Sequence, residues 1–419
     1  MAAAAVLAPY ELHTSAPGYL YNEPEWKALN SAHPSGTDFG ALPAGWPSKF
    51  TGPKLWSGDE LQTRPGDYIH VLSQSEIEEI DAALQFWKNL AKPVGDITRD
   101  HFPLSNLGPQ LRILANNIYN GVGIQILRGF PIKQYSKKDQ VLVFLGINSW
   151  IADRRLDQGA KRGVTHIKSV THIDPSKRGK IYVSAQDTQA QTFHNDAGSD
   201  VVGLMAVSLS GHGGLSSVAS AARVYNHLAE HRPDILRIMA ETKFRWKGRG
   251  IPKEGVRLIH HKRGQLYLNF STRPFHGYGE VPEHDSEYQP LTFEEREAFG
   301  GWQWTAHKLS LQIALREGDF EWVNNLQVQH GRTEFTEEQS NPRHLLRVWL
   351  RDTELSPELP ADIANKFDAM FDEEPENYPI DELEEDRLRQ ATGIYTGNCK
   401  DEQASDRLDA GGIRAGDEK

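Results

Sequence analysis

The stretch TFHNDAGSDVVGLMAVSLSG, residues 192–211, places His194 and Asp196 two residues apart, just before an apolar run that predicts a buried strand. On extended backbone, side chains two residues apart point to the same side. An imidazole nitrogen and a carboxylate oxygen can then bind one divalent cation, provided that a rigid element holds both. The stretch therefore predicts part of a metal site.

A second pair with the same spacing, His172 and Asp174, occurs in SVTHIDPSKRG. A proline and a basic loop follow this pair, so no strand would hold its side chains in place. We therefore favour His194 and Asp196 as ligands.

The third ligand is expected at the end of a late strand on the same side of the fold. VNNLQVQHGR ends such a strand with His330, followed by glycine. Two imidazoles and one carboxylate leave the opposite face of an octahedral metal open, which is the arrangement of non-haem Fe(II) oxygenases. His194, Asp196 and His330 are the predicted metal ligands.

The segment NPRHLLRVWLRD places Arg343 and Arg347 four residues apart on a predicted strand, hence on one face. That face is the interior if Leu346, Val348 and Leu350 pack on the other. A guanidinium in the interior needs a carboxylate partner, which an anionic cosubstrate beside the metal would supply. The alternative is an outward-facing, solvated pair.

Elements that could position these residues follow from the hydrophobic pattern. From residue 181, short apolar runs separated by glycine predict a mainly β jelly-roll or sandwich, interrupted by helical inserts at 216–240 and 292–318. Upstream, residues 75–91 predict a helix with Ser75 as N-cap and Glu78 closing a capping box. A second helix is predicted at 136–153, after a glycine turn and a buried strand within 116–132.

Over roughly residues 115–352 the chain resembles the taurine dioxygenase-like (TauD/TfdA) Fe(II)- and 2-oxoglutarate-dependent oxygenases, in particular their fungal members. The resemblance rests on five stretches in order: NGVGIQILRGFPI, FHNDAG, GHGGLSSVASAARVYNHL, NNLQVQHGR and PRHLLRVWLRD. It implies a jelly-roll core of the double-stranded β-helix, clavaminate synthase-like type.

The resemblance also implies roles. The three predicted metal ligands would hold Fe(II), and Arg343 would pair with the distal carboxylate of 2-oxoglutarate. Ser216 stands where the family commonly has a threonine and keeps the hydroxyl for the cosubstrate site. Arg347 matches an arginine that often meets an acidic group of the substrate.

In that family's chemistry, 2-oxoglutarate and O₂ react at the iron, release succinate and CO₂, and leave a ferryl-oxo species that attacks a substrate C–H bond. The implied substrate is a small carboxylate-bearing molecule, for example an amino acid in fungal secondary metabolism, such as valine closed to an aziridine. Hydroxylation, desaturation and ring closure stay open, because they differ only in how the substrate radical is placed.

Two alternatives are a protein-directed oxygenase of the JmjC type and a non-catalytic jelly-roll binding protein. No zinc-finger cysteines or histone-reading module support the first. The intact set of three ligands and Arg343 argues against the second, because a barrel without catalysis has no need of all four.

Composition limits the partners. The 419 residues carry a formal net charge of −11, which argues against nucleic-acid and membrane-surface partners because both are anionic. Cys399 is the single cysteine, so an intrachain disulfide is excluded and a reducing, cytoplasmic location is expected. A signal peptide and a membrane-spanning run are not recognised. A homo-oligomer is compatible with the sequence.

Four regions are expected along the chain. Residues 1–66 form an irregular N-terminal arm and 67–355 the jelly-roll oxygenase domain with its helical inserts. Residues 356–399 form an acidic C-terminal extension, and 400–419 a disordered tail.

Overall fold

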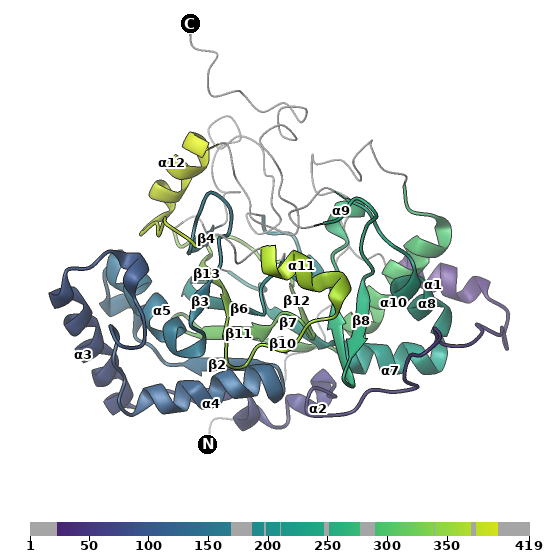
Figure 1. Ribbon diagram of the computed structural model, residues 1–419, viewed down its shortest axis with the longest axis horizontal. Helices are drawn as coiled ribbons and strands as arrows, with labels where there is room; N and C mark the ends of the chain where they lie inside the picture. The colour runs from purple at the N-terminus through teal and green to yellow at the C-terminus, as the bar shows by residue number, and fades with distance from the viewer. Residues whose placement is uncertain are drawn as a thin grey trace, which may run out of the picture.

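The computed structural model describes residues 23–168, 187–196, 198–209, 211–246, 251–276, 290–338, 340–369 and 374–392. Two β-sheets lie in the middle of the molecule, and helices flank them on both sides (Figure 1). Within these residues, no helix combines the length and the hydropathy that a membrane crossing requires.

The larger sheet has seven strands among the described residues, in the order β1-β2-β11-β6-β13-β3, with β4 also paired to β13. All its pairings are antiparallel except β1 with β2. The strands are β1 Ile69–Val71, β2 Ile124–Arg128, β3 Arg154–Arg155, β4 Thr165–Lys168, β6 Val201–Ser208, β11 Phe320–Asn324 and β13 His344–Arg351.

The smaller sheet has the order β10-β7-β12-β5, and a separate hairpin pairs β8 with β9. Neighbours in the smaller sheet come from distant parts of the sequence. Its strands are β5 Gln191–His194, β7 Ser216–Ser220, β10 Leu311–Ile313 and β12 Val328–Arg332, and the hairpin is β8 Ile259–Lys262 with β9 Gln265–Leu268.

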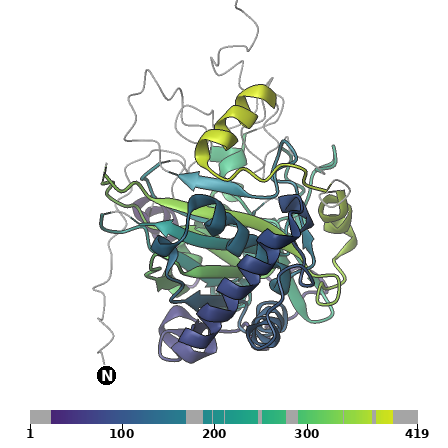
Figure 2. The ribbon, with the colours of Figure 1, turned by 90° about the vertical axis from the view of Figure 1, so that its left-hand side faces the viewer.

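The helices divide into two groups and a C-terminal pair. The first group is α3 Gln74–Leu90, α4 Leu107–Asn120 and α5 Lys137–Ile151; the second is α1 Glu23–Ala32, α7 Ala221–His231, α8 Pro233–Glu241 and α10 Phe293–Leu309. The short α2 Gly58–Leu61 and α9 Arg273–His276 precede the C-terminal α11 Ala361–Ala369 and α12 Glu382–Thr392. Figure 2 shows the first group in front of the larger sheet, with α12 above it.

Each face of the larger sheet has its own environment. Leu346, Val348 and Leu350 of β13 join the core formed with α3, α4 and α5, which meets the condition set above for an inward-facing Arg347. The intervening Arg347 and Trp349 therefore face the space between the sheets. β2 and β11 also pack against β7 and β10 through a cluster of hydrophobic side chains.

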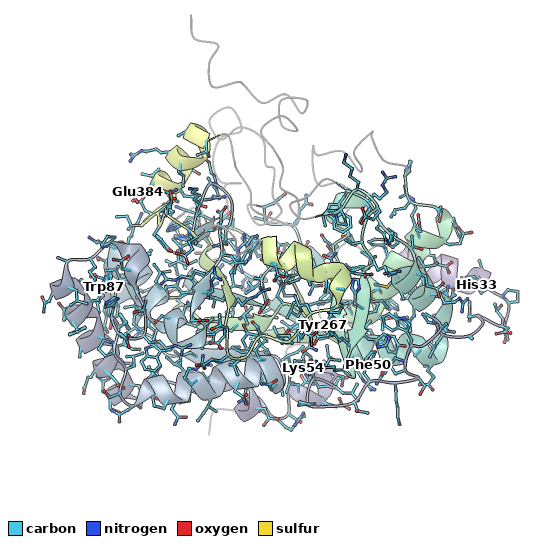
Figure 3. All side chains as sticks on the ribbon, in the orientation of Figure 1. His33, Phe50, Lys54, Trp87, Tyr267 and Glu384 are labelled. Atoms are coloured by element: carbon cyan, nitrogen blue, oxygen red, sulfur yellow. The ribbon has the colours of Figure 1, made fainter. Side chains whose placement is uncertain are left out.

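The described part of the N-terminal arm, residues 23–66, is packed against the rest of the molecule. The Lys54 ammonium donates to the Tyr119 carbonyl of α4 at 2.6 Å, and burial lowers the pKa of Lys54 to about 8. The Phe50 backbone N–H donates to Asn226 of α7 at 2.7 Å. Figure 3 shows Phe50 and Lys54 at the base of the molecule, between the two helix groups. The segment around Phe50 and Lys54 thus contacts a helix of each group.

Three sequence predictions about elements need correction. The predicted helix at 75–91 exists as α3, but its capping box is Ser73 with Glu76, not Ser75 with Glu78. Residues 216–220, predicted as the start of a helical insert, form strand β7. The second insert ends in strand β10 after α10.

Some predictions fall on parts of the chain that are not described. These are the His172–Asp174 pair, the strand expected at 181–185 and the tail at 400–419. The C-terminal extension is partly described and contains α11 and α12.

Candidate metal centre

His194 and His330 are cross-strand neighbours in the smaller sheet. His194 is the last residue of β5, His330 lies on β12, and the two are directly paired, with their ring centroids 4.4 Å apart. Asp196 follows two residues after His194, where the chain leaves β5 on its way to β6. Its Oδ1 lies 3.5 Å from His194 Nε2 and 3.7 Å from His330 Nε2. The three predicted ligands therefore converge.

The protonation of the two rings suits a metal. His194 Nδ1 lies 2.8 Å from the Thr192 carbonyl, which can only accept, so Nδ1 carries the proton and Nε2 offers a lone pair. Burial, followed by the charge of His194, lowers the pKa of His330 to about 3. His330 is therefore neutral at physiological pH. Among the described residues its Nδ1 has no hydrogen-bond partner.

The backbone of Asp196 is fixed by one side chain. The Asp196 N–H donates to Asn325 Oδ1 at 2.8 Å, and Asn325 Nδ2 donates to the carbonyls of Asp196 and Ser199 at 3.0 and 2.8 Å. Asn325 lies in the turn between β11 and β12. The turn that leads to His330 therefore also holds Asp196.

The carboxylate of Asp196 is fixed from the larger sheet. Its Oδ2 accepts from Arg347 Nη1 at 3.0 Å and from Trp349 Nε1 at 2.7 Å. Burial would raise the pKa of Asp196, but Arg347 and then the two histidines hold that pKa well below its usual range. Asp196 is thus ionised, and its Oδ1 is left facing the imidazoles.

Arg347 lies in the interior, as predicted, but it is not an unpaired cation. Besides Asp196, it contacts Gln158, whose Oε1 accepts from Arg347 Nε at 2.9 Å. Its guanidinium also lies over the Trp349 ring, 4.8 Å from the centroid. Asp196 therefore supplies a carboxylate partner for Arg347 before any substrate is bound.

Arg343 lies on the same interior face and is 7% exposed. Its guanidinium lies 5.5 Å from the centroid of the Phe335 ring, and its Nε has no acceptor among the described residues. Burial, followed by the charge of Arg332, lowers the pKa of Arg343 to about 9, so it is still a cation at neutral pH. A buried cation with an open donor fits a carboxylate ligand.

Ser216 reaches across from β7 to the larger sheet. Its hydroxyl donates to Glu321 of β11 at 2.6 Å, and Glu321 interacts electrostatically with Arg343. Burial raises the pKa of Glu321 to about 7, although the Ser216 hydrogen bond and Arg343 both oppose that rise. The predicted cosubstrate residues therefore share a buried carboxyl group that sequence reasoning did not single out.

These donors fit Fe(II) and 2-oxoglutarate. The imidazoles of His194 and His330 and the ionised carboxylate of Asp196 each offer a ligand atom, and these three atoms lie within 4.8 Å of one another. The open donor of Arg343 suits the cosubstrate's carboxylate.

Comparisons with known proteins agree. The sequence profile of the taurine catabolism dioxygenase TauD, TfdA family matches residues 88–349. The chain belongs to this family. As a TauD/TfdA-family protein it is a non-haem iron dioxygenase that uses 2-oxoglutarate.

Two relatives cover most of the chain. The taurine hydroxylase-like protein SAT17 of Stachybotrys chartarum is 32% identical over 332 residues, which is 77% of this chain and 85% of the relative. The FR-33289 synthase of Streptomyces rubellomurinus is 24% identical over 319 residues, which is 72% of this chain and 89% of the relative.

Among solved structures, asparagine oxygenase in complex with Fe(II), 2S,3S-3-hydroxyasparagine and succinate is similar in fold. It has a TM-score of 0.51 and 17% identity, over 68% of this chain and 93% of that one. A second asparagine oxygenase structure gives a TM-score of 0.52 over the same shares.

Sequence reasoning missed four residues that hold the site together: Gln158, Glu321, Asn325 and Trp349. Two had a visible signal. Glu321 is a lone acid in the apolar strand FEWVN, and Asn325 ends the NN pair that precedes β12. The other two contact the site only because β13 and the β3–β4 connection lie against it.

Proposed function

We propose that this enzyme oxidises an unactivated C–H bond of a small carboxylate-bearing molecule, with an amino acid as the foremost class, and releases succinate and CO₂. The convergence of His194, Asp196 and His330 beside the buried, open Arg343 carries the proposal. In this proposal the two facing sheets form the double-stranded β-helix of the family.

The residues of the site have different proposed roles. His194, Asp196 and His330 would hold the iron, and Arg343 would anchor the distal carboxylate of 2-oxoglutarate, with the Ser216 hydroxyl beside it. Iron with 2-oxoglutarate and O₂ supplies the oxidising power when bound. The protein's own part is to fix the ligands, hold the substrate C–H bond in reach and keep water out.

Charge balance favours an anionic substrate. Arg332, Arg343 and Arg347 are all buried, and Asp196 is the buried carboxylate that pairs with Arg347. A buried charge without a partner is costly, so a substrate carboxylate is favoured beside these cations.

We assign Arg347 first to Asp196, because Arg347 Nη1 donates to Asp196 and Arg347 Nε donates to Gln158. A metal ion bound to Asp196 would share the negative charge of this carboxylate. The positive charge of the Arg347 guanidinium would then be less fully neutralised. A contact between Arg347 and the substrate anion is therefore part of the proposal, in addition to its contact with Asp196.

The test is succinate formation from 2-oxoglutarate with a panel of amino acids, including valine and asparagine, matched uncharged amides and other carboxylic acids. We expect turnover above the substrate-free rate for one or more carboxylates and none for the matched amide. His194→Ala and His330→Ala should abolish it, whereas His231→Ala, at an exposed histidine of α7, should not. Stimulation only by protein substrates would support the JmjC-type alternative. Absence of iron binding would support a non-catalytic role.

A further inference from the structure

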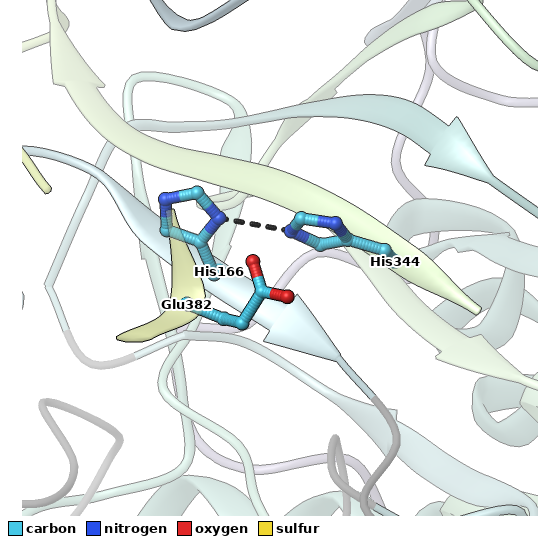
Figure 4. A group of neighbouring side chains, drawn as sticks. All are labelled: His166, His344 and Glu382. Carbon is cyan, nitrogen blue, oxygen red and sulfur yellow. Dashed lines mark hydrogen bonds between the residues drawn. The ribbon is translucent and has the colours of Figure 1, made fainter. Parts of the chain in front are cut away.

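A second group of potential metal ligands lies on the outer face of the larger sheet. His166 of β4, His344 of β13 and Glu382, the first residue of α12, each offer one ligand atom within 4.8 Å of the other two (Figure 4). His344 begins β13 and lies on the face of Leu346, opposite the face from which Arg347 contacts Asp196. The group is thus separate from the iron ligands.

The strand register brings the two histidines together. In the antiparallel β4–β13 pair, His344 lies opposite Lys168, and Leu346 lies opposite His166. His166 and His344 are therefore diagonal neighbours on one face, where side chains of this length reach each other. Their facing nitrogens, His166 Nδ1 and His344 Nε2, are 2.9 Å apart.

The protonation of His166 is set by the chain that leads into α12. Its Nε2 lies 3.0 Å from the Pro379 carbonyl, which can only accept, so Nε2 carries the proton. In the neutral ring, Nδ1 is then a lone pair that points toward His344. Metal-binding histidines are oriented in this way, with the second ring nitrogen donating to a carbonyl or carboxylate.

With His166 Nδ1 accepting, His344 Nε2 is the donor of the hydrogen bond between the two rings. A cation between the rings would replace this hydrogen atom, and His344 would then carry its proton on Nδ1. Burial, followed by the charge of His166, lowers the pKa of His344 to about 3, so this ring carries no second proton that the cation would have to displace.

Glu382 completes the group as an ionised carboxylate. Burial would raise its pKa, but the hydrogen bond from Lys168 and the charges of Lys168 and Lys137 lower it to about 2. Lys168 Nζ lies 2.5 Å from Oε1, and Lys137 Nζ lies 3.4 Å from Oε2. The Lys137 side chain is 63% exposed and Lys168 25%, so both ammonium groups can turn toward water when a cation binds.

We propose that His166, His344 and Glu382 bind a zinc ion, with water as a fourth ligand. Two imidazoles and a carboxylate form a common protein set for Zn²⁺, and imidazole ligands disfavour Mg²⁺ and Ca²⁺. The ion would join α12 to β4 and β13 directly behind Arg343. It would be a structural link between the C-terminal extension and the strand that begins directly after Arg343.

The test uses the full chain with His194→Ala and His330→Ala, which removes two ligands of the iron centre and leaves the Asp196–Arg347 pair intact. After chelation, we expect equilibrium dialysis to return one Zn²⁺ per chain and the melting temperature to rise with Zn²⁺. Co²⁺ should give the intense visible bands of a four-coordinate site. Because the iron centre is disabled, the result does not depend on the proposed function.

Two variants probe the ligands, and one is the control. Glu382→Gln keeps the side-chain shape, and His344→Gln removes one ring; each should weaken Zn²⁺ binding at least tenfold while circular dichroism stays unchanged. Glu384→Gln, at an exposed position of α12 (Figure 3), should bind as the parent does. No bound zinc in the parent, equal affinity in Glu382→Gln and His344→Gln, or the pale spectrum of six-coordinate Co²⁺ would each overturn the proposal.

Discussion

Asp196 uses its two carboxylate oxygens for different tasks. Oδ2 is held by Arg347 and Trp349 of the larger sheet, whereas Oδ1 faces the imidazoles of the smaller sheet. A carboxylate held on one side cannot rotate freely, so its free oxygen stays aimed at the metal position. Contacts of this kind around metal ligands typically change metal affinity 10–100-fold when they are removed.

Arg347→Met should therefore weaken Fe(II) binding by about tenfold or more. Methionine keeps much of the volume, so a loss reports the missing charge and hydrogen bonds rather than a cavity. The Fe(II) affinity is measured by anaerobic titration in the presence of 2-oxoglutarate, with the visible charge-transfer band as the signal. Unchanged iron affinity with weaker substrate binding would instead assign Arg347 to the substrate alone.

Arg343→Ala should raise the 2-oxoglutarate requirement by more than an order of magnitude, since removing one side of a desolvated charge pair costs roughly 2–5 kcal/mol. Ser216→Ala should cost less, because a neutral hydrogen bond contributes only about 0.5–1.5 kcal/mol. The 2-oxoglutarate dependence of succinate formation compares the two. Equal effects would mean that Arg343 does not anchor the cosubstrate.

Glu321 should make folding stability depend on pH. Burial raises its pKa from the usual 4.5 to about 7. Ser216 of β7, Arg343, just before β13, and Asp319, just before β11, also act on this pKa. Since the unfolded chain gives up this proton first, stability falls as pH rises from about 4.5 to about 7, on the order of 3 kcal/mol. Glu321→Gln, measured by urea unfolding at pH 5 and pH 8, should show a smaller fall than the parent. An equal fall would contradict this.

At the scale of elements, short polar signals decide where helices begin. Ser73 accepts from the Glu76 N–H, and the Glu76 side chain returns to the Ser73 N–H, so both donors at the start of α3 are satisfied. Ser75 contacts only the Ser73 hydroxyl among the hydrogen bonds described. The two serines are thus a matched pair for testing the cap.

Ser73→Ala should lower the free energy of unfolding by about 1 kcal/mol, the usual cost of losing an N-cap. Ser75→Ala should change it by a few tenths at most. Chemical denaturation of both variants under identical conditions gives the comparison. A larger loss at Ser75 would restore the cap predicted from the sequence.

At the scale of the molecule, the C-terminal extension is joined to the oxygenase core by buried charge. Glu385 of α12 accepts from Arg162 Nη1 at 2.5 Å and from the His166 N–H at 2.7 Å, and the Glu385 and Arg162 side chains are each 1% exposed. Arg389 adds a further contact to Glu385 at 3.0 Å. The packing of α12 therefore also positions Glu382 beside His166.

Glu385→Ala should destabilise the protein by about 3–5 kcal/mol, because it leaves the Arg162 guanidinium buried without its partner. Glu376→Ala is the control: this glutamate pairs with Lys161 at 2.6 Å but is 65% exposed, so its loss should cost less than about 1 kcal/mol. Thermal and urea unfolding of both variants give the two values. Similar losses of stability in the two variants would mean that the Glu385–Arg162 pair contributes no more than an exposed ion pair.

The sequence alone determined which residue types could bind iron and a dicarboxylate, because those properties are local. The spacing of two between His194 and Asp196, the strand end at His330 and the four-residue spacing of Arg343 and Arg347 singled out these side chains, and the resemblance to the TauD/TfdA family implied their roles. The strand that begins at Ser216 was missed, because its small residues favour neither helix nor strand and pairing with β10 and β12 decides it.

Only the tertiary structure decided which side chains share a partner. His194 meets His330 because β5 and β12 are neighbours in a sheet whose order differs from chain order. Asp196 meets Arg347 because the two sheets face each other, and no pattern along one strand reports a contact across that space. For the same reason, the partner of Arg347, the buried Glu321 and the group at His166, His344 and Glu382 came from the fold and not from any motif.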